Sequence, residues 1–180
     1  VATALEEEKV RERICEIVQA LYRHVPSGVG SCGGIEKLSD KALRDVLRKG
    51  SRWAVDRGYG SEEDLERTED RGCMEGADPA KVSERAIKRG LGQLGTLGSG
   101  NHFIEVGVVD TVYDSQAAGA LGLEEGQVTL LVHTGSRGFG YQVCDDSLKV
   151  MQHAVRKYGI ELPDRQLACA PLDSKEGKDY

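Results

Sequence analysis

The sequence predicts an α+β fold in which small mixed sheets are flanked by helices, within a single segment that covers residues 1–180. Apolar residues recur with helical spacing through the first half of the chain and again toward its C-terminal end. Between residues 93 and 132 this pattern gives way to short apolar runs separated by glycine-rich turns. No internal repeat or low-complexity stretch is visible, and 180 residues are enough for one domain with its own core, so one compact unit is expected.

Two helices are expected before residue 60. Residues 5–22 carry apolar side chains at the i, i+3, i+4, i+7 positions of an amphipathic helix. The glycine- and serine-rich residues 25–34 then form a loop, and Ser39-Asp40 opens a second helix that runs to about Asp56.

Two more helices are expected from their N-terminal residues. Ser61 is a helix N-cap, with Asp64 at the position where a capping box usually has Glu or Gln. Asp78-Pro79 is an N-cap followed by a proline at the first helical position, which predicts a fourth helix to about Arg89.

The C-terminal half predicts strands and then one long helix. Residues 93–110 read as two short strands around a Gly-Ser-Gly turn, and residues 127–132 form a further apolar strand. Helical periodicity returns at Arg137 and continues to about Tyr158. The expected core positions of this helix are Val143, Leu148, Val150, Met151 and Val155.

Composition restricts the class of protein. No run of about 18 apolar residues and no secretory signal is present, so we expect a cytoplasmic protein without a membrane partner. Five cysteines, odd in number and without a CxxC pair, argue against a disulfide framework or zinc ribbon, and we expect them to be reduced and mostly buried. The net charge of −6 means that any nucleic-acid site must be a local basic patch.

The first candidate site is the glycine-rich stretch from Gly95 to Glu105. Its glycines allow close approach of a ligand, and Asn101, His102 and Glu105 offer an amide, an imidazole and a carboxylate. Such glycine spacings are common and no helix follows to bind phosphate, so spacing alone favours a purely structural turn over a ligand site.

The second candidate is His133 with the Ser-Arg-Gly that follows it, where an apolar strand ends. Arg137 could hold a phosphate through two parallel hydrogen bonds. The alternative is a hydrogen-bonded core histidine.

The third candidate is a basic stretch of helix formed by Arg85, Lys88 and Arg89. These cations could contact an RNA backbone, or they could form an ordinary solvated helix face. His24 and His153 have no partner motif and are interpreted as surface or packing residues.

Taken together, GTLGSGNHFIEV and VHTGSRGFG resemble the two central signatures of the RtcB family of RNA-splicing ligases. Further segments are similar to the family's middle region: HVPSGVGS, WAVDRGYG, GADPAKVSERAIKRG and KYGIELPDRQL. The resemblance implies a ligase of tRNA splicing and RNA repair, which joins 3′-phosphate or 2′,3′-cyclic phosphate RNA ends to 5′-hydroxyl ends. GTP and Mn²⁺ would be its cofactors, RNA (tRNA halves or broken RNA) its substrate, and an archease-type activator a further partner.

By position, the resemblance makes His102 and His133 manganese ligands. It also implies that the stretch Asn101, His102, Phe103, Ile104 and Glu105 lines the GMP moiety, and that Arg137 faces the RNA. Imidazole suits a divalent transition metal that polarises phosphates, and a histidine nucleophile would store the nucleotide covalently.

The family's remaining catalytic residues are expected outside the chain. Its Asp-x-x-Cys metal motif should lie upstream of Val1, and a third metal histidine and the guanylylated histidine beyond Tyr180. We therefore expect a central fragment, truncated at both ends, with no catalytic nucleophile and no activity alone. Two other hypotheses stay open, a metal- or nucleotide-binding module without ligase activity and a structural domain whose histidines are core residues.

Overall fold

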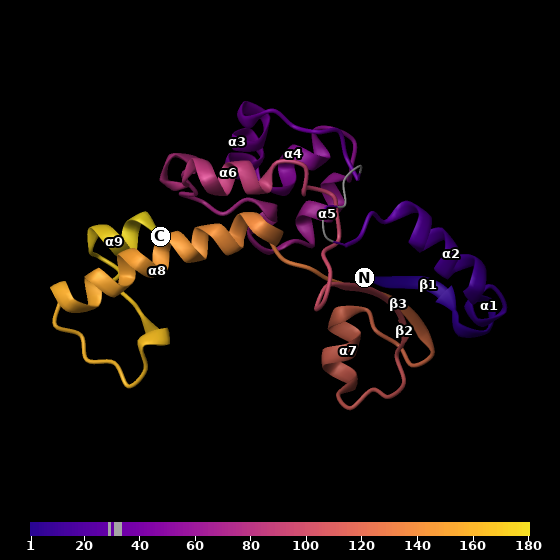
Figure 1. The fold of residues 1–180 in the computed structure, drawn as a ribbon. Helices are drawn as coiled ribbons and strands as arrows, with labels where there is room; N and C mark the ends of the chain where they lie inside the picture. Colours follow the sequence, from indigo (N-terminus) through magenta and orange to yellow (C-terminus); the bar gives the residue numbers. More distant parts are fainter. Residues whose placement is uncertain (29, 31–33) are drawn as a thin grey trace. The chain divides into compact units, whose positions relative to one another are not determined.

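The computed structural model describes residues 1–28, 30 and 34–180, and the chain divides into two compact units (Figure 1). The first unit consists of Val1–Glu36 and Gln93–Gly135, and the second of Lys37–Gly92 and Ser136–Tyr180. The first contains a small sheet and the second is built from helices, so the predicted α+β class is confirmed. Within the described ranges, no helix is long and apolar enough to cross a membrane.

The sheet of the first unit has three antiparallel strands in the order β1-β3-β2. These are β1 (Ala2–Glu6), β2 (Phe103–Val108) and β3 (Gln127–His133). The register of β2 and β3 runs from Phe103 opposite His133 to Val108 opposite Val128. The connection between these two strands carries the short helix α7 (Ser115–Leu121). The predicted strand over residues 127–132 is confirmed, and the strands of the described part of the chain form one antiparallel sheet.

The prediction of one helix over residues 5–22 is wrong in two respects. Residues 2–6 form β1, which the sequence pattern does not indicate, because the chain start is held by β3: the Val1 amino group donates to the Leu130 carbonyl at 2.7 Å. The helix itself is broken into α1 (Glu7–Glu12) and α2 (Ile14–His24) at Arg13, whose backbone leaves the helical region at φ −116° and ψ 15°. Figure 1 shows both helices beside the sheet.

The prediction of two strands within residues 93–110 is also wrong for the first of them. Among the pairings of described residues, only Leu97 pairs there, in an isolated parallel bridge with Ser27, and the Leu97 amide donates to the Pro26 carbonyl at 2.8 Å. Residues 94–100 therefore form a turn-rich approach to β2 instead of a strand. The predicted loop over residues 25–34 lies partly outside the described residues.

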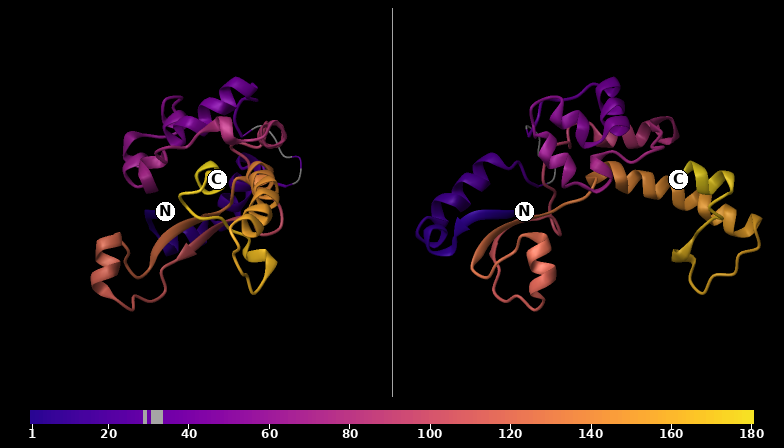
Figure 2. Two further views of the ribbon diagram at one scale, coloured as in Figure 1. Left: turned by 90° about the vertical axis from the view of Figure 1, so that its left-hand side faces the viewer. Right: turned by 180° about the vertical axis from the view of Figure 1, so that it is seen from behind.

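The second unit packs short helices against one long one (Figure 2). Its α-helices are α3 (Asp40–Lys49), α4 (Ser51–Val55), α5 (Glu62–Glu66), α6 (Glu84–Gly90), α8 (Arg137–Lys157) and α9 (Lys175–Asp179). Three 3₁₀ turns lie between them: η1 (Glu69–Gly72), η2 (Pro79–Lys81) and η3 (Arg165–Leu167). The buried apolar residues of this unit include Leu43, Trp53, Leu65, Ile87 and Ala154. Helix α6 packs against α8, which joins chain segments that are about 50 residues apart.

Two predicted helices of this unit are each interrupted. The helix expected from Ser39 to Asp56 is divided at Gly50, which has a φ of 57°, and a Cβ there would lie 1.9 Å from the Gly72 carbonyl oxygen. Asp78-Pro79 caps only the 3₁₀ turn η2, and the N-cap of α6 is Ser83, whose hydroxyl accepts from the Ala86 amide. The capping box of Ser61 and Asp64 on α5 is confirmed.

The long helix α8 confirms the prediction for residues 137–158, but not all of its expected core positions. Met151 is buried, whereas Leu148 and Val150 are exposed. The expectation that the cysteines are mostly buried is wrong for the four described ones, Cys15, Cys73, Cys144 and Cys169, which are free and exposed. They lie on uncovered helix surfaces or in loops, and Cys32 lies outside the described residues.

Candidate functional site

Two candidate ligand residues lie at one end of the β2–β3 strand pair. His133 is the last residue of β3, and its Cα partner is Phe103, the first residue of β2. The two rings stack, with centroids 5.1 Å apart and planes inclined by 9°. His133 is exposed, so it is not a core histidine of this unit.

His102 comes directly before β2 and is held from two sides. Its Nδ1 lies 3.0 Å from the hydroxyl oxygen of Thr134, the residue that follows β3. On the other side Gly98 lies against the ring, since a Cβ at this glycine would be 2.5 Å from the imidazole Cδ2. The glycine therefore makes room for the ring, and the hydroxyl fixes the ring's orientation.

The predicted nucleotide stretch, residues 101–105, is divided between two faces of the sheet. Side chains alternate along a strand, so Phe103 and Glu105 share the face of His133, and Ile104 points the other way. Ile104 lines an apolar groove of about 320 Å³ against α2. Asn101 lies exposed in the turn before the strand. A ligand on the His133 face can therefore meet Phe103 and Glu105, but not Ile104 at the same time.

The donor set supplies part of a metal site. Among residues 1–28, 30 and 34–180, no group of three or more His, Cys, Asp and Glu side chains is placed to hold a metal ion. Two imidazoles are present, and the Thr134 hydroxyl oxygen can accept a hydrogen bond from Nδ1–H of His102. That tautomer leaves the lone pair of Nε2 for a metal, as is common for ligating histidines. The residues fit a divalent metal only with further ligands from water or from other polypeptide.

The four candidate RNA contacts all belong to the second unit. Arg85, Lys88 and Arg89 are exposed on α6. Arg137 is the first residue of α8, half-buried, with a left-handed φ of 53° that is unusual for a residue with a Cβ. The structure thus groups the cations on one packed helix pair, whereas the histidines belong to the first unit.

One of these cations is more firmly held than the sequence suggests. Arg89 Nη1 donates to the side-chain oxygen of the buried Gln142 at 3.0 Å. Gln142 in turn donates to Asp146 at 2.8 Å, and Asp146 also accepts from the Ser83 hydroxyl at 2.5 Å. The bonds from Ser83 and Gln142 lower the pKa of Asp146, so its carboxylate stays ionised.

Two residues that hold candidate ligands were not predicted from the sequence, Thr134 beside His102 and Gln142 beside Arg89. Thr134 stands next to His133, but a threonine after a strand gives no sign of a partner 32 residues away. Gln142 is a polar residue within the helical pattern of α8, and its burial, which points to its role, is visible only in the structure. His24 and His153 are exposed, as expected for surface residues.

Known proteins resemble this chain over its full length. The family model described as tRNA-splicing ligase RtcB matches residues 1–180. The chain is 56% identical over 180 residues to the tRNA-splicing ligase RtcB of Pyrococcus horikoshii and 53% identical to that of Methanocaldococcus jannaschii. It is 50% identical over 181 residues to the RNA-splicing ligase RtcB of Mycobacterium tuberculosis. Each alignment covers all of this chain but only 21%, 18% and 42% of these relatives, respectively.

Proposed function

The chain belongs to the tRNA-splicing ligase RtcB family, and on this basis we propose that it forms part of the active site of an RNA ligase. The reaction joins RNA ends with a 3′-phosphate or 2′,3′-cyclic phosphate to 5′-hydroxyl ends, using GTP and Mn²⁺. Its substrates are tRNA halves or broken RNA, and an archease-type protein is a candidate activator. In this proposal residues 1–180 are the central segment of a larger ligase domain.

The observation that carries the proposal is the pairing at the end of β2 and β3. His133 lies opposite Phe103, and His102 is the next residue before Phe103, so both histidines come from the same end of two adjacent strands. A bound divalent metal would supply Lewis-acid polarisation of the reacting phosphates. In this proposal His102 and His133 hold the metal from either side of the strand end, since neighbouring residues alternate in face, while Thr134 fixes the orientation and tautomer of His102.

The remaining roles follow from position. Asn101 offers its amide to a hydroxyl or phosphate of the nucleotide, and Phe103 and Glu105 meet the nucleotide on the His133 face. The predicted GMP-lining stretch also includes His102 and Ile104. The nucleophilic histidine and the missing metal ligands belong, in this proposal, to polypeptide outside residues 1–180.

The test uses the full-length protein that contains this chain, with His102→Ala and His133→Ala as separate variants. An RNA with a 3′-phosphate end and one with a 5′-hydroxyl end are incubated with GTP and Mn²⁺, and the joined product is resolved on a gel. Each variant should lose at least about 100-fold in ligation rate. Changing a residue that only supports a metal ligand costs up to about 100-fold, and removing a ligand should cost no less. His153→Ala, an exposed histidine of α8, is the matched control and should ligate normally.

Two results would contradict the proposal. One is ligation at the normal rate by both histidine variants, which would show that neither His102 nor His133 is needed for the reaction. The other is a wild-type protein that binds Mn²⁺ and GTP but never joins RNA. That second result would favour the alternative function, a metal- or nucleotide-binding module without ligase activity.

A further inference from the structure

Tyr141 is an aromatic side chain exposed on the helix pair that carries the candidate RNA contacts. It lies in the first turns of α8 and is 66% exposed. The guanidinium carbon of Arg89, which comes from α6, lies 5.2 Å from the centroid of its ring. Proteins bind unpaired RNA bases by stacking them on aromatic rings and on guanidinium planes. Here both kinds of surface occur side by side.

A buried network fixes this pair. Gln142 is fully buried, and its amide oxygen accepts the hydrogen bond from Arg89. Its amide nitrogen donates to Asp146 at 2.8 Å and to Asp145 at 3.3 Å. The glutamine therefore uses both ends of its side chain, and Arg89 is anchored to α8 before any ligand arrives. Such preorganisation reduces the entropy that a long side chain loses on binding.

A second cation shares the helix face of Arg89. Arg85 precedes Arg89 by four residues on α6, so the two arginines lie on one face of that helix. Since the chain as a whole has a net charge of −6, this concentration of arginine is a local feature. A phosphate that flanks an unpaired base on the ring could contact Arg89 or Arg85.

We propose that Tyr141 and Arg89 form a stacking site for an unpaired base of an RNA substrate, and that Gln142 is the positioning residue that holds Arg89 in place. The inference rests on the proposed ligase function and specifies the ligand class, single-stranded RNA near the ends to be joined. Because every base has a π-face, the site should tolerate sequence differences in the RNA.

The first experiment compares Tyr141→Leu with Tyr141→Phe in the full-length protein. Binding of a single-stranded RNA that contains 2-aminopurine is followed by the fluorescence quenching that accompanies stacking. Tyr141→Leu should bind about ten-fold more weakly, as expected for the loss of one base–aromatic stack, and should lose the quenching. Tyr141→Phe keeps the ring and should behave like the wild type. Tyr113→Leu, at a tyrosine that is 95% exposed in the first unit, is the matched control and should change neither.

Salt dependence separates stacking from charge. Tyr141→Leu removes no charge, so the slope of the logarithm of affinity against the logarithm of salt concentration should stay at the wild-type value. Arg89→Gln removes one cation and should reduce the magnitude of that slope by about 0.7.

The positioning role of Gln142 is tested by a double-mutant cycle. Gln142→Leu should weaken binding of single-stranded RNA, and adding Tyr141→Leu should weaken it little more, because both changes remove one shared interaction. A merely structural role would give additive effects. Circular dichroism and thermal unfolding establish that each variant folds, and if Gln142→Leu does not fold, Arg89→Gln takes its place in the cycle.

The outcomes distinguish the two proposals. If the wild type ligates RNA while Tyr141→Leu binds and quenches as the wild type does, the stacking site is overturned and the ligase function stands. If the wild type neither binds RNA nor joins its ends, both are overturned.

Discussion

The two units of the chain hold their candidate functional residues in opposite ways. In the first unit, His102 and His133 lie at a strand end, where His102 contacts Thr134 and Gly98 and His133 stacks on Phe103. In the second unit, Arg89 is part of a network in which Gln142, Asp146 and Ser83 are all hydrogen-bonded. The first arrangement is a partial ligand set, whereas the second is complete within this chain.

This difference indicates that metal binding by the histidines should depend on polypeptide outside this chain more than RNA binding by the helix pair does. Two imidazoles bind a divalent metal weakly, so the histidine site should gain its affinity only with ligands from outside residues 1–180. Arg89 of the basic helix pair needs no such completion, because its hydrogen bond to Gln142 already orients it within this chain. The following predictions test that contrast, from the largest expected effect to the smallest.

The largest effect should be the absence of a covalent GMP adduct on the 180-residue chain alone. The proposed nucleophile lies outside it, so incubation with labelled GTP and Mn²⁺ followed by denaturing electrophoresis should give no labelled band. The full-length protein should be labelled under the same conditions. An acid-labile, hydroxylamine-sensitive band on the isolated chain would show that the nucleophile is within residues 1–180.

The next largest effect should come from Gly98→Ala in the full-length protein. A Cβ there would meet the His102 ring at 2.5 Å, so the imidazole must move and the metal site should lose roughly 10- to 100-fold in Mn²⁺ affinity. Titration calorimetry measures this loss. Gly119→Ala is the control, because a Cβ at this glycine of α7 meets nothing within 4 Å. Equal Mn²⁺ affinities in the two variants would show that His102 is not a ligand of the metal.

A smaller and graded effect is expected from the cations of the second unit. Replacing Arg85, Lys88, Arg89 and Arg137 together with alanine should weaken RNA binding and flatten its salt dependence. The log–log slope should fall by about 0.7 for each phosphate that is no longer neutralised. GTP loading should change less, since the proposed nucleotide residues lie in the first unit.

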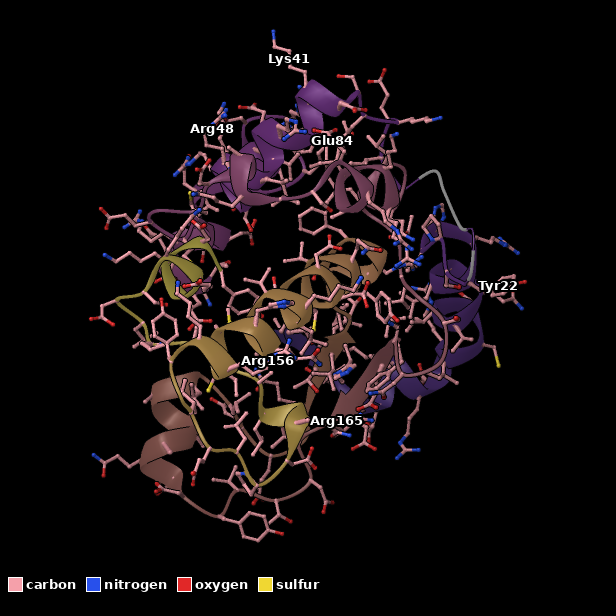
Figure 3. The ribbon with its side chains drawn as sticks, turned by 60° about the vertical axis from the view of Figure 1, so that its left-hand side comes forward. Tyr22, Lys41, Arg48, Glu84, Arg156 and Arg165 are labelled. Carbon is pink, nitrogen blue, oxygen red and sulfur yellow. The ribbon has the colours of Figure 1, made fainter. Side chains whose placement is uncertain are left out.

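A charge-matched pair controls for this effect. The double variants Arg85→Ala/Lys88→Ala and Lys41→Ala/Arg48→Ala remove the same number of cations from the same unit, and the second pair lies on α3 (Figure 3). Only the first pair should reduce the slope. Identical slopes for both pairs would assign Arg85 and Lys88 to a solvated helix face.

The smallest effect should be a pH dependence confined to the end of the second unit. Glu176 of α9 accepts hydrogen bonds from Lys157 and Tyr158, and these lower its pKa from the ordinary value of 4.5 to about 2. A lowered pKa in the folded state contributes stability above pH 4.5, and that contribution is lost as the pH falls toward 2. Thermal unfolding between about pH 6 and pH 2 should therefore show a steeper loss for the wild type than for Glu176→Gln. Parallel curves would contradict a role for this ion pair.

The sequence predicted those parts of the fold that depend on neighbouring residues. The long helix from Arg137, the strand from Gln127 and the capping box at Ser61 all have their determinants within a few positions. It failed where distant segments decide. Residues 2–6 become a strand only because β3 lies beside them, and Gly50 breaks a helix where the Gly72 carbonyl approaches.

The candidate sites follow the same rule. His102, His133 and the basic residues were identified from local motifs, and the histidines do come from one end of a strand pair. Their convergence on one metal stays a prediction. Local sequence gave no sign of the bonds from Thr134 to His102 or from Gln142 to Arg89, because these span 32 and 53 residues.

The most direct test of the central claim is pulsed electron paramagnetic resonance of Mn²⁺ bound to the full-length protein with ¹⁵N-labelled histidine. If His102 and His133 are both ligands, the wild type should show imidazole nitrogen couplings, and each of the single variants His102→Ala and His133→Ala should reduce them. His153→Ala should leave them unchanged. Nitrogen couplings that remain at wild-type strength in both His102→Ala and His133→Ala would contradict the proposed metal site.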